Sequence, residues 1–486
     1  NGLSCISGVS TKLGFLVGLI RGLGGNLSIS DRSSLAREVF AWARERPPDI
    51  NAPLDCDVHS SGEKLFSYSL HSGAVFGSGD EVSPLKKSVI QTVSTQRTLA
   101  HLRPWIESAE PFLLVGNEGC GKDLMIQYAF AQLRKITVVT LHCSARTEAA
   151  DVIAKIQQHC SLFSGPDGRV YRPRDCERLV LYLKNLNLPK PDMYDTCMLI
   201  EFLQQIVTFG GFYDTTLEFL RISNIQIVSS INPATTVGRH PLSTRFTAVV
   251  RICYLGYPDS QELTSIYDKL LEITFKEAIN TGGDLAASNL ANFSKPKDRL
   301  KFAGTLVEIY EKVKTSFLVD DARHYLFTPR DLSAWVKNLL RYDLANEDFL
   351  EVVIYEGSRI FRDRMVDADS EAKLDTIVGT TFRSKWNNIP SLAGIHFTTL
   401  ASTPITGARC AERRNDSISA PLLVRIGTAD FVACVEKGLE YYQRENTEIR
   451  MLLFPQLLEH VSRVDRVISS PGGSLLLIGR SGVGRR

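Results

Sequence analysis

The segment VGNEGCGKD, residues 115–123, has the spacing of a phosphate-binding loop. Gly116, Gly121 and Lys122 complete the pattern Gly-x-x-x-x-Gly-Lys. A glycine-rich turn of this kind directs backbone N–H groups toward phosphates, and the helix after it adds the positive end of its dipole. The lysine would bridge the β and γ phosphates of a nucleotide. We therefore predict a nucleotide cradle made of Gly116, Asn117, Glu118, Gly119, Cys120, Gly121, Lys122 and Asp123.

The residue after Lys122 departs from the pattern. A Ser or Thr normally stands there and holds Mg²⁺ through its hydroxyl, whereas this chain has Asp123. A carboxylate is also a ligand for Mg²⁺, so Asp123 is a weak candidate for a metal ligand. It also brings negative charge close to the phosphates. The expected cofactor is ATP or ADP, with Mg²⁺ as an optional companion.

Hydrolysis requires an acidic pair at the end of the third strand, one carboxylate to hold Mg²⁺ and one to polarise the attacking water. The run RLVLYLKNLNLP places Lys184 and Asn185 there. A cation is a poor partner for Mg²⁺, and an amide cannot act as a base. We expect a nucleotide that is held without hydrolysis. An empty structural loop and an autonomous ATPase that uses Asp123 remain as alternatives.

Three further polar residues are candidates for the site. Asn232, after the fourth strand, is either a group beside the γ phosphate or a turn-forming Asn-Pro. Arg245, in RHPLSTRF, either reaches the γ phosphate of a neighbouring module or is a surface or salt-bridged arginine. Arg330, in FTPRDLSAWV, either closes over the nucleotide or is an exposed residue at a helix start.

Short apolar runs and amphipathic stretches must position these residues. Strand-like runs occur at 111–115, 136–143, 178–183, 225–232 and 248–253. Helix-compatible segments separate them, which predicts a five-stranded parallel sheet covered on both faces. Amphipathic stretches at 260–279, 298–317, 328–343 and 346–367 then predict a helical bundle, and an earlier helix is expected at 33–46.

Composition excludes several classes of protein. The chain has 486 residues, which predicts two to four domains, and its 56 basic and 54 acidic residues nearly balance. No basic block of the kind found in nucleic-acid arms is present, so a helicase or clamp loader is a disfavoured alternative. The 10 cysteines form no Cys-x-x-Cys pair, which favours free thiols over zinc. The longest apolar run, 13–20, is shorter than the ~20 residues of a membrane span.

One strand-turn element occurs twice. PFLLVGNEGCGKD at 111–123 corresponds to SLLLIGRSGVGRR at 474–486, where Arg485 and Arg486 replace the Lys and the Ser or Thr of the pattern. So distant a repeat predicts whole modules in tandem. The chain also begins without Met and ends inside the second element, so we expect it to be a piece of a longer protein.

Several motifs resemble those of a ring module of dynein heavy chains. They are LVLYLKNLNLPKPDMYDT (179–196), GGFYD (210–214), IQIVSSINP (225–233), GRHPLSTRF (238–246) and FTPRDLSAWVKNLL (327–340). The segments 169–184 and 479–486 resemble the intraflagellar-transport, or cytoplasmic type 2, class of that family. The resemblance implies an α/β fold: a P-loop AAA+ module with a five-stranded parallel sheet and a helical lid, flanked by partial neighbouring modules.

The resemblance also implies a division of the chain. Residues 1–57 are similar to the helical lid end of a second AAA+ module, and 58–84 to a connection. Residues 85–255 are similar to the large α/β domain of the third module, and 256–365 to its helical lid. Residues 366–440 are then an inter-module connection, and 441–486 the start of a fourth module with a degenerate P-loop.

Residue roles follow from the same resemblance. Lys122 and its loop would bind ATP or ADP, Asn232 would be the sensor asparagine, and Arg330 the lid arginine. Arg245 would be the arginine finger that serves the preceding module's site. The whole motor would be an ATPase, whereas Lys184 and Asn185 imply that this site is regulatory and does not hydrolyse.

On this resemblance the chain is part of a motor ring that moves toward microtubule minus ends. Its partners would be the neighbouring AAA+ modules of the same chain. Accessory chains and microtubules would bind parts outside these residues, in a dimeric motor with no nucleic-acid or membrane contact. Cytoplasm, cytoskeleton and cilium or flagellum are the expected locations. An autonomous P-loop ATPase, a nucleic-acid-handling AAA+ protein and a purely architectural module remain the alternatives.

Overall fold

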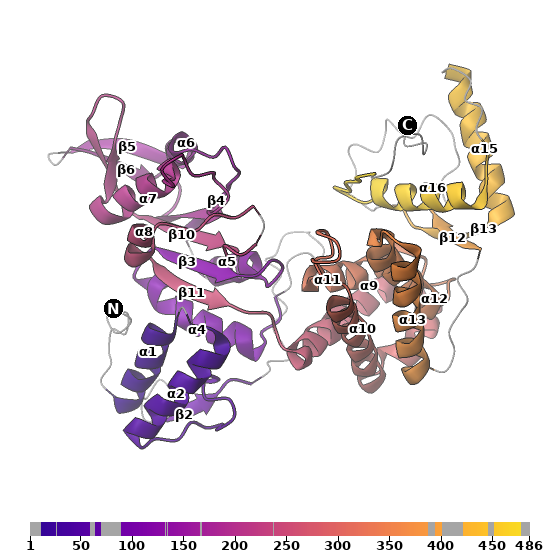
Figure 1. Ribbon diagram of the computed structural model, residues 1–486, viewed down its shortest axis with the longest axis horizontal. Coiled ribbons are helices and arrows are strands. Elements are labelled where there is room, and N and C mark those ends of the chain that lie inside the picture. Colours follow the sequence, from indigo (N-terminus) through magenta and orange to yellow (C-terminus); the bar gives the residue numbers. More distant parts are fainter. Residues whose placement is uncertain are drawn as a thin grey trace. The chain divides into compact units, whose positions relative to one another are not determined.

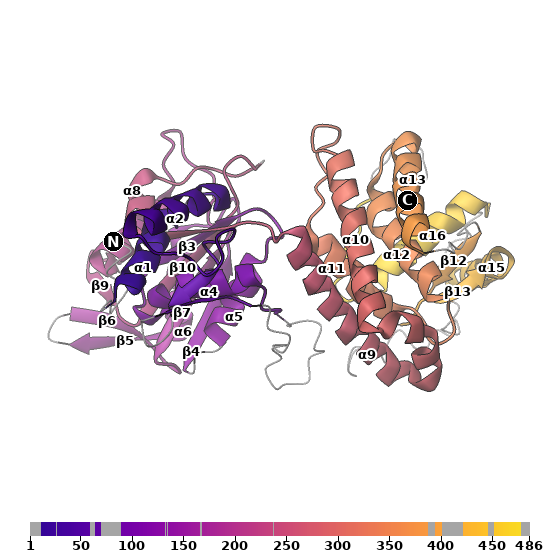
Figure 2. The same cartoon turned by 90° about the horizontal axis from the view of Figure 1, so that it is seen from below.

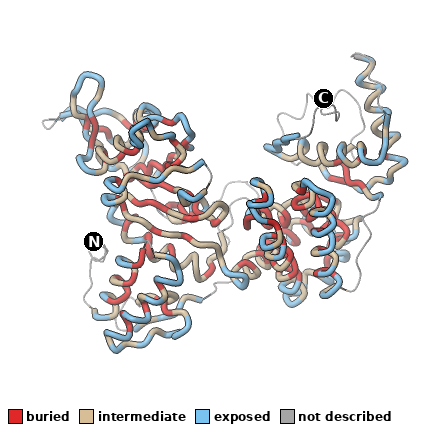
Figure 3. The backbone as a smooth tube through the Cα atoms, viewed as in Figure 1, coloured by how far each residue is buried: buried red, intermediate tan, exposed pale blue. Residues whose placement is uncertain are grey.

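The computed structural model describes residues 11–25, 27–58, 64–69, 89–131, 133, 135–165, 168–236, 238–386, 394–400, 421–445 and 452–477. These residues form two compact units, Asn1–Glu262 and Leu263–Arg486 (Figure 1). Each unit has buried side chains of its own (Figure 3).

A parallel sheet forms the centre of the first unit. Its strands, in spatial order, are β11 (Arg251–Leu255), β3 (Phe112–Gly116), β10 (Ile225–Ile231), β7 (Arg178–Lys184) and β4 (Ile136–His142). Every pair of neighbours is parallel, which confirms the predicted five-stranded parallel sheet. The fifth strand begins later than the apolar run at 248 suggested, because α8 (Thr244–Val249) takes up the first residues of that run.

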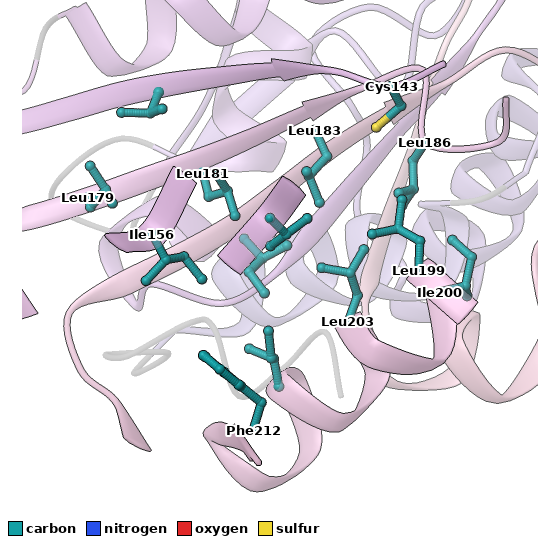
Figure 4. Close-up of a cluster of buried hydrophobic side chains, with 14 of the residues drawn as sticks. Cys143, Ile156, Leu179, Leu181, Leu183, Leu186, Leu199, Ile200, Leu203 and Phe212 are labelled. Carbon is teal, nitrogen blue, oxygen red and sulfur yellow. The ribbon is translucent and has the colours of Figure 1, made fainter. Parts of the chain in front are cut away.

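Helices cover both faces of this sheet, as parallel pairing requires. On one face α6 (Ala149–His159), α7 (Met198–Phe209) and α8 pack against residues such as Leu179, Leu181 and Leu183 (Figure 4). On the other face α4 (Val93–Glu107) and α5 (Lys122–Ala131) pack against Val180 and Tyr182. Alternate residues of β7 therefore serve opposite cores, because side chains of a strand point to opposite faces in turn.

A second, four-stranded sheet was not predicted. It consists of β5 (Cys160–Gly165), β6 (Gly168–Pro173), β9 (Phe219–Ile222) and β8 (Gly211–Tyr213), in that spatial order. The β5–β6 pair precedes β7 in the chain, and the β8–β9 pair precedes β10, so both are insertions between strands of the main sheet. The turn sequence Gly-Pro-Asp-Gly at 165–168 is the signal that would have indicated the first hairpin.

The first unit also contains α1 (Lys12–Gly24), α2 (Ile29–Ala43) and the antiparallel strands β1 (Cys56–Val58) and β2 (Leu65–Ser67). Residues Leu16, Ile20, Val39 and Phe40 form a small core between α1 and α2. The helix expected at 33–46 starts and ends earlier, since Ser28 caps its start and Arg44 ends it with a left-handed backbone, at a φ of 55°.

The second unit begins with a helical bundle, as predicted. Its helices are α9 (Ser260–Ser294), α10 (Pro296–Ser316), α11 (Pro329–Asn338), α12 (Phe349–Phe361) and α13 (Ala368–Lys385). The three-residue helices η1 (Leu339–Arg341) and η2 (Arg362–Arg364) follow α11 and α12. Gly283, with a φ of 64°, kinks α9. Figure 2 shows α10, α11 and α12 from a second side.

The rest of the second unit comprises the antiparallel pair β12 (Ile395–Thr398) and β13 (Val424–Gly427) with α15 (Thr428–Glu445) and α16 (Pro455–Ile468). The second glycine-rich loop, including Arg485 and Arg486, lies outside the described residues. Among the helices that the structure describes, none is both long and apolar enough to cross a membrane.

Candidate functional site: a phosphate-binding loop with a Lys184–Asp123 ion pair

The glycine-rich loop joins β3, which ends at Gly116, to α5, which begins at Lys122. Gly119 and Gly121 have φ values of 77° and 91°, a region that other L-residues rarely enter. At Gly116 a side chain is excluded for another reason. An added Cβ atom would lie 2.4 Å from the carbonyl oxygen of Leu255 and 2.8 Å from Sγ of Cys120. The glycine pattern is therefore a requirement of the loop geometry.

Lys122 lies inside this loop. Its ammonium Nζ donates hydrogen bonds to the carbonyl oxygens of Gly116 at 2.7 Å and Asn117 at 2.8 Å. It also donates to Oδ1 of Asn232 at 3.0 Å. The residue is 9% exposed, and burial lowers the pKa of its ammonium, against the raising effect of Cys120 and Asp123. The positive charge of Lys122 thus lies at the start of α5, where the positive end of the helix dipole lies as well. Both favour a bound anion.

Asn232, directly after β10, contacts Lys122, and its assignment beside a γ phosphate remains a prediction. It is buried, and its backbone carbonyl accepts a hydrogen bond of 2.7 Å from Nδ2 of Asn187. Asn187 is itself buried, and its carbonyl accepts a bond from the backbone N–H of His240 at 3.0 Å. The loops after β7 and β10 therefore hold Asn232 in place on the side facing Lys122.

The two residues that break the sequence pattern contact each other. Lys184, the last residue of β7, forms an ion pair with Oδ2 of Asp123 in the first turn of α5. The Tyr182 hydroxyl donates to Oδ1 of Asp123 at 2.5 Å and lies 2.8 Å from Oγ of Ser230. Burial by itself raises the pKa of Asp123, but the hydrogen bonds from Lys184 and Tyr182 and the charges of Lys184 and Lys122 outweigh it. The net result is a lowered pKa, so the carboxylate is ionised.

These contacts do not support Asp123 as a metal ligand. One carboxylate oxygen faces an ammonium and the other accepts from a phenol. Asn185, the next residue after Lys184, has a φ of 60° in the turn that leaves β7. Its amide has no basic nitrogen or oxygen that could accept a proton from water. Neither the engaged carboxylate of Asp123 nor the amide of Asn185 is thus placed to take a proton from water.

Arg245 is not part of this cluster in the described residues of the first unit, and Arg330 belongs to the second unit. Arg245 lies in α8 with a 74% exposed side chain, and its Nη1 is 3.6 Å from a carboxylate oxygen of Glu201. Arg330 is an exposed residue in the first turn of α11, in the second unit. Their assignments as arginine finger and lid arginine remain predictions.

The sequence analysis did not identify three residues whose hydroxyl groups contact the loop, its helix or each other: Tyr182, Ser230 and Tyr257. Tyr182 was read only as part of an apolar strand, and Ser230 as part of the next one. Tyr257 was also missed; its hydroxyl donates to the carbonyl oxygen of Glu118 at 2.6 Å. The strand period offers a signal for Tyr182 and Lys184, because residues two apart point to the same face of the sheet.

Family models match three parts of the chain. The model "P-loop containing dynein motor region" matches residues 78–258, and "Dynein heavy chain, ATPase lid domain" matches residues 286–371. A third, "Cytoplasmic dynein 2 heavy chain 1, AAA+ ATPase domain", matches residues 1–43.

Curated proteins are similar over the whole chain. Proteins named cytoplasmic dynein 2 heavy chain 1 from Tripneustes gratilla and Homo sapiens are each 42% identical to it, across 100% of this chain and 11% of theirs. The protein of that name from Chlamydomonas reinhardtii is 36% identical, across 100% of this chain and 10% of its own. The chain thus spans only 10–11% of the length of these relatives.

Proposed function

The chain belongs to the dynein heavy chain family, and from that premise we propose that its P-loop module binds a nucleotide as a regulatory site and does not hydrolyse it. The observation that carries this proposal is the pair Lys184 and Asn185 at the end of β7, beside an intact loop lysine. Nucleotide is therefore held by the cradle while the chemistry of water activation is missing.

Support for nucleotide binding comes from the loop itself. Its glycines adopt the backbone that brings N–H groups toward a ligand, and Lys122 and Asn232 meet on the same side of the sheet. Both side chains are buried, and the three N–H donors of Lys122 now bond Gly116, Asn117 and Asn232. Phosphate oxygens would replace some of these acceptors, so the ammonium would keep its hydrogen bonds on binding.

Support against hydrolysis comes from charge and proton chemistry. An attacking water must be polarised by a base and the γ phosphate must be neutralised by a metal or arginine. At this site Asn185 stands where the base is needed. In place of the metal stands Lys184, whose single charge is partly offset by Asp123. The module would then act through nucleotide binding alone. A nucleotide that binds one of two ring geometries more tightly shifts the equilibrium toward that geometry.

The role of the longer protein is also a proposal. By its similarity to cytoplasmic dynein 2 heavy chains the chain would be part of an ATP-driven, minus-end-directed motor of intraflagellar transport, working in the cytoplasm and cilium. Residues 85–255 and 256–365 would be the third module and its lid. Residues 1–57 and 441–486 would belong to the neighbouring modules, with 58–84 and 366–440 as connections. Arg245 would serve the preceding site, and Arg330 the lid.

The test is equilibrium binding of ATP and ADP to the 486-residue chain, with phosphate release followed in the same samples. We expect saturable binding without phosphate release. Lys122→Ala should lose at least about tenfold in affinity because it removes the loop cation, while the exposed Lys190→Ala should bind as the parent does. Absence of binding in the parent chain would leave the architectural alternative, and release that depends on Lys122 would leave the ATPase alternative.

A further inference from the structure

The positions of Asp123 and Lys184 are the two at which a P-loop protein usually holds Mg²⁺. The hydroxyl after the loop lysine and the aspartate at the end of the third strand share that ion. In this chain a carboxylate stands at the first position and an ammonium at the second, and the two side chains form an ion pair. A carboxylate thus replaces the usual hydroxyl, an ammonium replaces the usual carboxylate, and the two side chains contact each other directly.

The structure shows how the side chain of Lys184 reaches Asp123 from a strand that is not next to the loop's own strand. Strand β10 lies between β3 and β7, so β7 is two strands away from the loop. Neighbouring strands are about 4.8 Å apart, and only long side chains bridge two of them. Lys184 pairs in register with Ser230 of β10, and both Lys184 and Tyr182 reach across that strand to the carboxylate of Asp123.

These residues do not fit a magnesium ion. Mg²⁺ requires about six oxygen ligands in a tight octahedron at about 2.0–2.1 Å. Both oxygens of Asp123 are engaged, one by the ammonium and one by the Tyr182 hydroxyl at 2.5 Å. An ammonium against the carboxylate also repels a dication. Within the described ranges, no group of three or more His, Cys, Asp or Glu side chains could hold a metal ion.

Lys184 can still do part of the metal's work. An ammonium carries three N–H donors, and Asp123 accepts from it on one side. The side chain is 30% exposed, so its head group is accessible at the end of the sheet where Lys122 also lies. Its backbone is fixed by β10 and by β4, and its carbonyl accepts from the N–H of Cys143 at 3.0 Å.

We propose that the ammonium of Lys184, held by Asp123, takes the place of the magnesium ion, so that the site binds a nucleoside diphosphate or triphosphate in its metal-free form. This inference rests on the proposed nucleotide site and adds its cation requirement. The single positive charge of the Lys184 side chain, fixed to β7, would replace the double positive charge of a diffusible Mg²⁺ ion. The phosphates are then bound by two lysines, Lys122 from the loop and Lys184 from β7, with no metal to polarise the γ phosphate.

The first experiment compares the affinity of the 486-residue chain for ADP and for ATP in excess EDTA and in excess Mg²⁺. We expect no gain in either affinity on adding Mg²⁺, and a loss where Mg²⁺ binds the free nucleotide and so competes with the site. A gain of about fivefold or more on adding Mg²⁺ would overturn the inference and leave the proposed nucleotide site standing. No nucleotide binding in either condition would overturn both.

The second experiment restores the usual residue types. The double variant Asp123→Thr, Lys184→Asp should bind nucleotide at least about tenfold more tightly with Mg²⁺ than with EDTA. Mn²⁺ provides an independent readout: the spin resonance signal of a Mn²⁺ and ADP mixture should stay that of the protein-free mixture when the parent chain is added, and should diminish further when the double variant is added. Mn²⁺ taken up by the parent chain in an ADP-dependent manner would contradict the inference.

A charge control completes the design. Lys190→Asp reverses the charge of an exposed lysine between β7 and α7. It should leave the effect of Mg²⁺ on nucleotide affinity the same as in the parent chain. If the double variant fails to fold, as judged by its thermal melting, the comparison of the parent chain in EDTA and Mg²⁺ still decides the question.

Discussion

The ammonium of Lys184, at the end of β7, and the carboxylate of Asp123, in the first turn of α5, form an ion pair at the end of the central sheet. Taken singly, each residue breaks the pattern of a P-loop nucleotide site. Together they form one compensated contact, with Tyr182 as a third member. In the proposed function, the pair would let the site hold phosphates without the acidic residues that hydrolysis needs.

The strength of this pair is measurable by a double-mutant cycle. Asp123→Asn, Lys184→Met and the combination should give a coupling of about 1 kcal/mol in unfolding free energy. The value is modest because the side chains are 36% and 30% exposed, which admits solvent screening. Hydrogen-exchange mass spectrometry of peptides from 110–130 would report it for the first unit alone. Coupling indistinguishable from zero would mean that the pair does not form in solution.

Gly116→Ala should disrupt the loop. The new Cβ would lie 2.4 Å from the backbone oxygen of Leu255, so β11 or the loop must shift. We expect a loss of about 1–3 kcal/mol in stability of the first unit, as for other overpacked sites, together with loss of nucleotide binding. Gly379→Ala in α13 is the matched control, because nothing lies within 4 Å of its added Cβ. That change should be neutral or stabilise the second unit by up to about 1 kcal/mol.

His101 should make the first unit sensitive to acid. It is 6% exposed in α4, lies edge-on to Trp105 and is near Arg32 and Arg21. Burial, with a smaller contribution from the two arginines, lowers the pKa of His101 from 6.5 to about 3. Between these values the unfolded chain binds a proton that the folded chain does not. The contribution of neutral His101 to the unfolding free energy of the first unit is therefore fully present above pH 6.5. It is lost as the pH falls, by up to about 1.4 kcal/mol per pH unit.

The window from pH 6.5 down to about 5 isolates this effect from carboxylate titration. Pulse proteolysis in urea, with fragments of 89–258 identified by mass spectrometry, would give the slope for the first unit. His101→Phe should flatten it, whereas the exposed His142→Gln should keep it. An unchanged slope in His101→Phe would show that another group titrates.

Glu356 should be a large determinant of stability in the second unit. It is fully buried in α12 and accepts hydrogen bonds from Asn338 at 2.7 Å and Tyr342 at 2.6 Å. It also forms an ion pair with Arg466 of α16, whose Nε donates at 2.9 Å. Glu356→Ala should cost about 3–5 kcal/mol because it leaves the Arg466 charge buried without its counter-ion.

The same proteolysis assay applied to fragments of 263–385 would measure this loss. Glu436→Ala, an exposed glutamate of α15, is the control and should change stability by less than about 0.5 kcal/mol. The combined Glu356→Met, Arg466→Met variant should be more stable than Glu356→Ala, since no charge is then left unpaired. A small effect of Glu356→Ala would argue against the buried network.

Much of the fold could be predicted from the sequence because its strands are short apolar runs between helix-compatible segments. The main sheet and the helical bundle follow from that pattern. The β5–β6 pair was missed although the turn at 165–168 indicates it, and the β8–β9 pair was missed because strands of 3 and 4 residues are too short to show a periodic pattern. The strand after α8 was misplaced because Val249 is apolar yet belongs to the helix.

The candidate site was predictable where sequence neighbours make it and unpredictable where the sheet makes it. The loop lysine and Asn232 came from local patterns, and the structure brings them to 3.0 Å. The Asp123–Lys184 contact joins the start of α5 to the end of β7, so it depends on how that helix packs on the sheet, which the sequence does not state. Tyr257 was missed for the same reason: its partner, the carbonyl of Glu118, lies far away in the chain.

The chemical fate of bound ATP tests the central claim most directly. The 486-residue chain would be mixed with ATP and Mg²⁺, and the bound nucleotide isolated and identified over time. The triple variant Asp123→Thr, Lys184→Asp, Asn185→Glu, which restores metal-holding and water-polarising groups, is the positive control and should convert bound ATP to ADP. We predict that the parent chain returns its nucleotide as ATP. Conversion to ADP by the parent chain, abolished by Lys122→Ala, would contradict the account.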